Sequence, residues 1–371
     1  FSIPRGINVF CVLLNSLASE GRGKAWKFNM QTAGRPLGQK VILAVLIFGL
    51  LAFLLYFALY INPSQVVQIL SKTNLEIYAT AFIAYFIYAF FSSLVWRSLL
   101  NSLSVEITSR KAFLFTWVGL FFDATVPQLG WSGEISKTYL LNKDSSLSAG
   151  KIGASVVSQK LFNMTITVVA MSLGLGFVLV GYSVPFVITF LISLVLSLLI
   201  LTLVLIYYIS VKPSATKTLL SWAVKLISFF RKTWNPTNFR LKAEGLLASF
   251  HVGMQHLRGN SKSLVKPIIY SVTSFVFEIS VTFITFLALG YPVPVDKVLI
   301  VFTLTGTLQT VGFTFFGVPE LIMSLSFTAL GIPAALSVSV TLLTRVVSLW
   351  FRLVVSYGAL QWAGIKIILN K

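Results

Sequence analysis

Four charged residues in otherwise apolar sequence recur at one spacing. Glu134 is followed about 25 residues later by Lys160, and Glu320 is followed at nearly the same distance by Arg345. A charge at the centre of a membrane helix costs about 2.5–3.5 kcal/mol on insertion scales, so such residues usually face a partner or a polar cavity. The spacing predicts a Glu134–Lys160 pair and a Glu320–Arg345 pair, which either bind a charged ligand or serve only as structural ion bridges.

A third cation, Arg352, follows Arg345 by seven residues, or two helical turns. Residues at this spacing project from nearly one face of an α-helix. The planar guanidinium group donates paired, charge-assisted hydrogen bonds to phosphate, so two arginines on one face favour an anionic lipid headgroup as ligand. The alternative for Arg352 is that its side chain extends toward the aqueous interface.

Glycine and proline residues interrupt both stretches. Glycine permits tight backbone turns, and proline lacks the backbone N–H that a continuous helix needs. Helix ends near the middle of a membrane are typical of transporters, because they offer unpaired backbone groups to a polar ligand. We predict helix breaks, with packing kinks as the alternative, at Pro127, Gly130, Gly133, Gly312, Gly317 and Pro319.

The composition is that of a membrane protein. Of 371 residues, 56% are hydrophobic and 11% are charged, and several apolar runs reach the length of about 18 residues that can cross a bilayer. The sequence has one cysteine, Cys11, and two histidines, which lie in a basic loop. These residues give no support for a disulfide framework, a metal site or another cofactor. The sequence therefore predicts an all-α, polytopic membrane protein.

We predict one transmembrane domain, residues 41–362, between a basic leader of residues 1–40 and a tail of residues 363–371. Six full spans are expected near residues 41–61, 77–97, 154–181, 185–210, 266–290 and 334–362, and two re-entrant helical hairpins near residues 112–130 and 298–331. Three full spans separate the two repeated stretches, and an odd number places them on opposite sides of the membrane. The halves, about residues 77–181 and 266–362, are therefore expected to form an inverted repeat.

The positive charge is concentrated in particular loops. The formal net charge is +19, and most Lys and Arg residues fall in the leader, between residues 97 and 151, in the loop of residues 211–266 and in the tail. These segments share one side in the predicted topology, so the positive-inside rule places both termini in the cytoplasm and the protein in the cell membrane. This explanation needs no nucleic acid partner. The loop 211–266 also mixes apolar and basic residues, which indicates amphipathic helices on anionic headgroups.

The two stretches resemble the flippase-like transmembrane family typified by the membrane domain of lysylphosphatidylglycerol synthases, the multiple peptide resistance factors. The resemblance covers nearly all of residues 41–362 and rests on residues 127–134 with Tyr139-Leu140-Leu141, on Gln159-Lys160, and on residues 317–320 with Leu330-Gly331-Ile332 and Arg345. The family usually has Glu-Arg in place of Gln159-Lys160, and a more glycine-rich turn at residues 317–319. The resemblance implies transfer of a charged or glycosylated lipid between leaflets, by members that occur with or beside lipid-modifying enzymes.

We expect a lipid flippase rather than an enzyme, because the chain as given carries no aminoacyl-transferase domain. The headgroup of its anionic, aminoacylated or polyprenyl-linked substrate is expected to bind to Arg345, Lys160 and Arg352. Glu134 and Glu320 of the same site are expected to hold the broken helices or to bind a cationic headgroup. One alternative is a membrane enzyme or accessory subunit acting on polyprenyl-phosphate-linked glycans, although the sequence has no paired acidic motif on a polar loop. Another is a scaffold that recruits a partner through the basic loop. A lipid-modifying enzyme and a second copy of the chain are the protein partners left open.

Overall fold

Helices make up the described part of the protein. The computed structural model describes residues 50–125, 131–144, 149–181, 186–230, 237–310 and 317–369, and no strand occurs in these ranges. Five helical segments are long and apolar enough to cross a bilayer. They contain α4 (Leu75–Ser102), α7 (Ala149–Gly181), α8 (Phe186–Val211), α11 (Val265–Ala288), and α14 (Ala334–Arg345) joined to α15 (Arg352–Leu369). The prediction of an all-α polytopic membrane protein is therefore confirmed.

The first predicted span, residues 41–61, is described only from residue 50 onward. A helix of residues 50–60 ends there, and the chain bends by 94° into α3 (Pro63–Ser71), so that the pair is either one broken span or a re-entrant segment. The bend has a local cause. The Asn62 side chain caps α3 by accepting a hydrogen bond from the Ser64 N–H at 3.0 Å, and a proline at the first helical position has a backbone already suited to a helix start.

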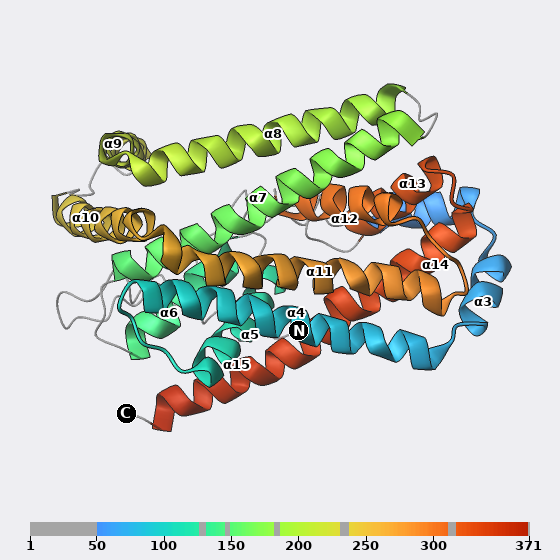
Figure 1. The fold of residues 1–371 in the computed structure, drawn as a ribbon, viewed down its shortest axis with the longest axis horizontal. Helices are drawn as coiled ribbons and strands as arrows, with labels where there is room; N and C mark the ends of the chain where they lie inside the picture. Colours follow the sequence, from blue (N-terminus) through green and yellow to red (C-terminus); the bar gives the residue numbers. More distant parts are fainter. Residues whose placement is uncertain are drawn as a thin grey trace. The chain divides into compact units, whose positions relative to one another are not determined.

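Helices α4 and α11 lie side by side and antiparallel near the middle of the helical unit (Figure 1). Their ends meet where the Asn74 N–H donates to the Ala288 carbonyl oxygen at 2.8 Å. Their middles meet where the Ser274 hydroxyl donates to the Tyr88 carbonyl oxygen at 3.1 Å. Small buried residues on α4, such as Ala81, permit the close backbone approach on which helix association in membranes depends.

Two pairs of shorter helices correspond to the predicted hairpins. α5 (Ser109–Thr125) packs against α6 (Ser132–Asp144), and α12 (Val295–Thr310) packs against α13 (Val318–Ala329). Figure 1 shows α5 and α6 toward the end of the helical unit that also holds α10, whereas α13 lies toward the opposite end.

The first hairpin was predicted too short. Its expected range, residues 112–130, covers most of α5, but α6 packs along α5 and extends the hairpin to Asp144. Hydropathy assigns α6 to a loop because the helix is rich in polar residues. Of the predicted helix breaks, Pro127, Gly130 and Gly312 lie outside the described residues.

The last span is not a continuous α-helix. A π-helical segment, Val346–Phe351, lies between α14 and α15. Arg345 and Arg352 would share one face only if the helix had 3.6 residues per turn throughout, whereas a π-helix has a wider turn with i to i+5 hydrogen bonds. Helix α15 also continues to Leu369, into the predicted tail of residues 363–371.

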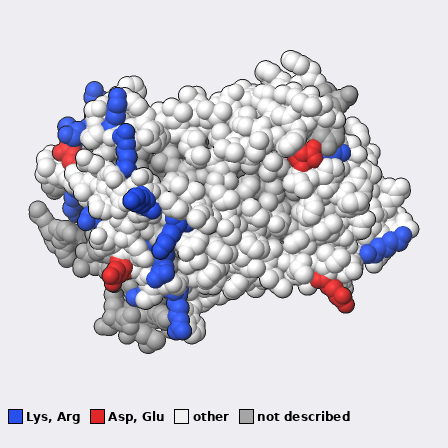
Figure 2. Space-filling view, in the orientation of Figure 1, with Lys and Arg blue, Asp and Glu red and all other residues white. Residues whose placement is uncertain are grey.

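The loop predicted for residues 211–266 contains two helices, α9 (Pro213–Phe230) and α10 (Thr237–Gly259). Figure 1 shows α9 nearly end-on beside the end of α8, so its axis crosses the axes of the long helices. Helix α10 packs closely on α7, because Gly150 of α7 has no side chain and the α10 backbone can approach it. A Cβ atom at position 150 would lie 2.8 Å from the Phe250 backbone nitrogen. Figure 2 shows Lys and Arg side chains gathered at this end of the visible face, which we call the basic end.

Candidate ligand-binding cavities

The Glu320–Arg345 ion pair joins the second hairpin to the last span. The Arg345 Nε donates a hydrogen bond to the Glu320 Oε1, and the two residues are 5% and 0% exposed. The other carboxylate oxygen, Oε2, accepts a hydrogen bond from the Gly317 N–H at 2.6 Å. Gly317 has a φ of 106°, in the region that favours glycine, and Pro319 occupies the first turn of α13. The ion pair predicted between Glu320 and Arg345 is therefore formed.

A cavity of about 90 Å³ adjoins this ion pair and is lined by both arginines of the last span. Its wall contains five buried polar atoms that have no hydrogen-bond partner within the described structure: Arg345 Nη2, Arg352 Nε, and the hydroxyl oxygens of Thr282, Thr305 and Thr344. The three threonines are at most 6% exposed. A buried polar group without a partner costs about 1–3 kcal/mol, so this cavity is suited to a ligand that accepts hydrogen bonds.

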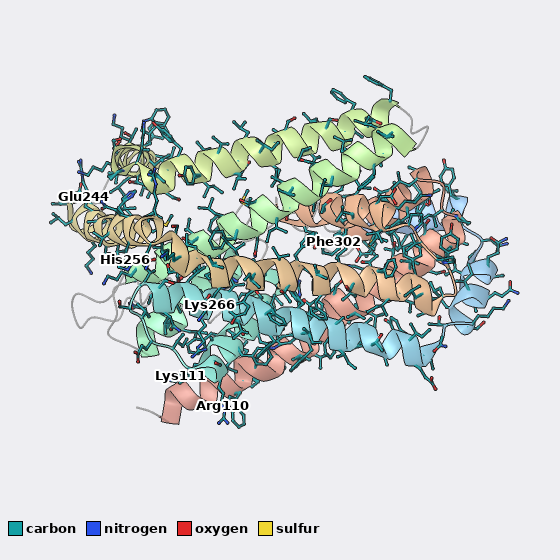
Figure 3. The ribbon with its side chains drawn as sticks, viewed as in Figure 1. Arg110, Lys111, Glu244, His256, Lys266 and Phe302 are labelled. Carbon is teal, nitrogen blue, oxygen red and sulfur yellow. The ribbon has the colours of Figure 1, made fainter. Side chains whose placement is uncertain are left out.

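A larger cavity of about 200 Å³ adjoins the first, and Glu278, Phe302 and Gly306 line both. Lys160 and Asn163 of α7 line the larger cavity but not the smaller one. Figure 3 labels Phe302, which α12 presents toward α11, and its ring packs edge-on against that of Phe275 with centroids 5.9 Å apart. The two cavities thus form one polar region with cations on two sides.

Arg352 faces carboxylates and phenols from three other helices. Glu278 of α11, Asp123 of α5 and the hydroxyls of Tyr85 and Tyr88 of α4 all lie within range of its charge. Glu278 makes no hydrogen bond or ion pair with another residue in the described ranges. Arg352 is therefore placed in the polar region and not at the aqueous interface, which was the alternative for this residue.

In the first half, Asp123 has the bridging role that Glu320 has in the second. Its Oδ1 accepts hydrogen bonds from the Gly133 N–H at 2.7 Å and from the Ser132 hydroxyl at 3.1 Å, which ties α6 to α5. Glu134 lies next to this contact, and its Oε2 is buried without a hydrogen-bond partner. Neither α5 nor α6 is among the spanning helices, and burial, followed by the charge of Glu134, raises the pKa of Asp123 to about 6.

Lys137 is a buried cation, although the predicted topology puts it in a cytoplasmic loop. It is 6% exposed, donates to the Gln159 Oε1 at 3.3 Å and lies 5.5 Å from the centroid of the Trp96 ring. Burial lowers its pKa, while the charges of Glu134 and Asp123 raise it. The sequence does indicate that Lys137 lies near Glu134, because residues at i and i+3 share a helix face.

The predicted Glu134–Lys160 pair is wrong: no such ion pair occurs among the described residues. Lys160 instead lines the larger cavity, with its ammonium 5.5 Å from the centroid of the Trp131 ring. Arg345 follows Glu320 by 25 residues, and the residue 25 positions after Glu134 is Gln159. Gln159 is buried, and its amide group donates to the Ser92 carbonyl oxygen at 3.1 Å. The two halves therefore differ in charge at this position.

Substitution of Gly133 tests the close contact between α5 and α6. A Cβ atom there would lie 2.5 Å from the Gly119 carbonyl oxygen and would also overlap the Asp123 carboxylate. We expect Gly133→Ala to reduce the stability of the purified protein by about 1–3 kcal/mol, as overpacking usually does, measured by thermal unfolding in detergent micelles. The matched control is Gly176→Ala in α7, where no atom lies within 4 Å. Equal effects of the two substitutions would contradict the contact.

The part of the chain that forms these cavities matches the sequence profile of a known family. The sequence profile described as the lysylphosphatidylglycerol synthase TM region matches residues 41–356, which include every residue that lines the two cavities. The chain belongs to this family. The resemblance found in the sequence is therefore confirmed.

The chain is also similar to archaeal membrane proteins over most of its length. A UPF0104 membrane protein of Methanocaldococcus jannaschii is 27% identical over 312 residues, which cover 83% of this chain and 91% of the relative. A UPF0104 membrane protein of Pyrococcus horikoshii is 24% identical over 322 residues, which cover 84% of this chain and 93% of the relative. The similarity thus extends across the transmembrane domain and is not confined to the charged motifs.

Proposed function

We propose that the protein is a lipid translocase that takes an anionic headgroup into the polar region between its helices. The observation that carries this proposal is the group of five buried, unpartnered atoms around the smaller cavity, all on side chains that can donate hydrogen bonds. Guanidinium and hydroxyl donors match the oxygens of a phosphate group, and arginine binds phosphate through paired, charge-assisted hydrogen bonds. A cationic ligand would meet two arginines there, with Glu278 as the one carboxylate among the described residues that line the cavity.

The charges of the region support the same ligand. Glu320 neutralises Arg345 through one side of its guanidinium group and leaves Nη2 directed at the cavity. Arg352 lines the smaller cavity together with Glu278 and Tyr85, and Lys160 lines the larger one. An anionic headgroup in this region would lie beside these cations, which lowers the cost of its charge at membrane depth.

The size of the region and its surroundings support a lipid. The cavities, about 200 and 90 Å³, are each below the roughly 300–1,000 Å³ that encloses a whole small molecule. They would admit a headgroup and leave the acyl chains in the bilayer. A polyprenyl-linked or aminoacylated phosphate fits the same donors, so phosphate is the shared chemistry of the candidate substrates. The proposal does not include a catalytic step by this chain.

The arrangement of the halves supports alternating access. In the proposed inverted repeat, α4 to α7 corresponds to α11 to α15, and each unit holds one helical hairpin. The hairpins lie toward opposite ends of the helical unit (Figure 1), as the two hairpins of an inverted repeat would. Movement of one unit against the other would open the polar region first to one leaflet and then to the other. By the positive-inside rule, the basic end lies in the cytoplasm, with the protein in the cell membrane.

The test is leaflet exchange in reconstituted vesicles. Purified protein is incorporated into vesicles that contain a trace of fluorescent phosphatidylglycerol or fluorescent phosphatidylcholine, and the outer leaflet is quenched with dithionite. We expect protein-dependent exchange of the anionic lipid and little exchange of the zwitterionic lipid, because the latter brings a cationic group close to Arg345 and Arg352. Exchange of the two lipids at equal rates, or no exchange above that of empty vesicles, would contradict the proposal.

A further inference from the structure

Helix α9 presents an apolar face to the outside of the helical unit, at the basic end. Leu219, Trp222, Leu226 and Phe229 are 50%, 71%, 61% and 76% exposed. They follow one another at intervals of three, four and three residues, which places them on one side of an α-helix. Large apolar side chains in a continuous exposed group of this kind mark an interaction surface.

The opposite side of α9 packs against the protein. Thr216 is buried, and its hydroxyl lies 2.7 Å from the His251 Nε2 of α10. Leu220, Val224 and Ile227 continue this side at helical spacing and are half-buried, and α9 contacts both α10 and α8. The helix therefore does not need its exposed apolar face to hold it in place, and that face is left for a partner.

A third side of α9 is polar and basic. Lys217 and Lys225 are exposed, and Ser221 and Ser228 share their side of the helix. Before α9 begins, the Lys212 ammonium lies 4.8 Å from the centroid of the Tyr208 ring at the end of α8, and an aromatic residue beside a lysine is common where a span leaves the membrane. The apolar face thus has cationic side chains along its edge.

We propose that α9 lies within the headgroup layer of the leaflet at the basic end, with its apolar face in the acyl boundary and its lysines at the phosphates of anionic lipids. Three observations favour a lipid surface over a protein partner. The axis of α9 crosses the axes of the spans (Figure 1), as a helix in the membrane plane must. The helix follows directly on α8, where that span ends. Its lysines lie at the end where other Lys and Arg side chains gather, among them Arg110, Lys111 and Lys266 (Figures 2 and 3).

This surface is separate from the two cavities, and the inference does not rest on the proposed translocase activity. Its chemical requirement is a leaflet that contains anionic lipid. Each lysine near such a surface strengthens binding roughly fivefold. The surface would hold the basic end at a fixed depth and raise the local concentration of anionic lipid beside the protein.

The test compares nitroxide labels on two faces of α9 in the full chain, reconstituted in vesicles. Cys11→Ser removes the one native cysteine, and Leu226→Cys or Ser221→Cys then provides an attachment site on the apolar or the polar face. We expect the label at position 226 to be relaxed by oxygen and protected from a water-soluble nickel chelate, as at a depth of about 5–10 Å. The label at position 221 should show the reverse. Equal access of the nickel chelate to both labels would overturn the proposal.

Two further measurements separate the lipid surface from other occupants. Reconstitution at less than one protein per vesicle should leave the protection at position 226 unchanged, whereas its loss on dilution would assign the face to a second copy of the chain. Addition of phosphatidylglycerol to phosphatidylcholine vesicles should increase the protection, and Lys217→Gln combined with Lys225→Gln should abolish that increase. If the protection at position 226 changed neither with the lipid charge nor with the lysine substitutions, the role of anionic lipid would be overturned.

Discussion

Glu320→Gln is expected to reduce the stability of the protein by about 3–5 kcal/mol, because loss of one partner leaves a buried charge without compensation. Arg345 is the partner that would remain, 5% exposed. The glutamine keeps the size of the side chain and an oxygen that can accept the Gly317 N–H, so the substitution isolates the charge from the cap of α13. The measurement is unfolding of the purified protein in mixed detergent micelles, followed by circular dichroism.

The chain offers a matched control for this substitution. Arg240 and Glu244 form an ion pair with side chains 60% and 42% exposed, and Glu244→Gln should change the stability by less than about 1 kcal/mol, as for most surface pairs. The double substitution Glu320→Leu with Arg345→Met should recover much of the loss, because an apolar pair of similar volume leaves no buried charge. A loss in the double variant as large as in Glu320→Gln would contradict an uncompensated buried charge as the cause of that loss.

Arg352→Met is expected to reduce exchange of fluorescent phosphatidylglycerol about 10- to 100-fold, the loss that corresponds to a charged hydrogen bond worth about 1.5–3 kcal/mol. The Nε of Arg352 has no partner among the described residues, so in the proposed mechanism its partner is the headgroup. Methionine retains much of the apolar stem. Stability should therefore fall less than in Glu320→Gln, and this contrast separates a ligand contact from a structural one.

Two variants complete this experiment. Arg352→Lys keeps the charge but loses the planar fork, so it should give an intermediate rate. Arg110→Met removes an exposed arginine at the basic end and should leave exchange unchanged. If Arg352→Met exchanged anionic lipid at the wild-type rate while the protein remained folded, the headgroup would not be bound at this residue.

The spans could be predicted from the sequence because hydropathy alone decides them. Long apolar runs correspond to α4, α7, α8, α11 and the last span. The helix α6 was missed for the converse reason: it is polar, and its burial depends on tertiary contacts such as that between Gly133 and Asp123. Lys137 was missed with it. A polar helix held inside a protein cannot be distinguished from a loop by its composition.

The charged pairs show how far spacing arguments reach. Glu320 and Arg345 were matched correctly, because two opposite charges at membrane depth have few other ways to be neutralised. The match of Glu134 with Lys160 failed by a single position. Successive residues of an α-helix differ in direction by about 100°, so Gln159 faces the first hairpin while Lys160 faces the larger cavity.

The group of unpartnered donors could not be predicted. Most hydroxyls in the described helices donate to the carbonyl oxygen three or four residues earlier, as Thr285 and Thr341 do. Thr282, Thr305 and Thr344 do not, and no feature of the sequence separates the two sets. Their meeting with two arginines also requires helices from distant parts of the chain, so only the structure reveals this cavity.

The π-helical segment Val346–Phe351 determines how the last span tolerates changes in length. A π-turn holds about one residue more than an α-turn, so deletion of one residue here would let the helix close into regular α-geometry without breaking the chain. The residues beyond the deletion would keep nearly the same direction, so Arg352 would stay at the cavity, whereas a deletion in a regular part of the span would turn everything beyond it by about 100°.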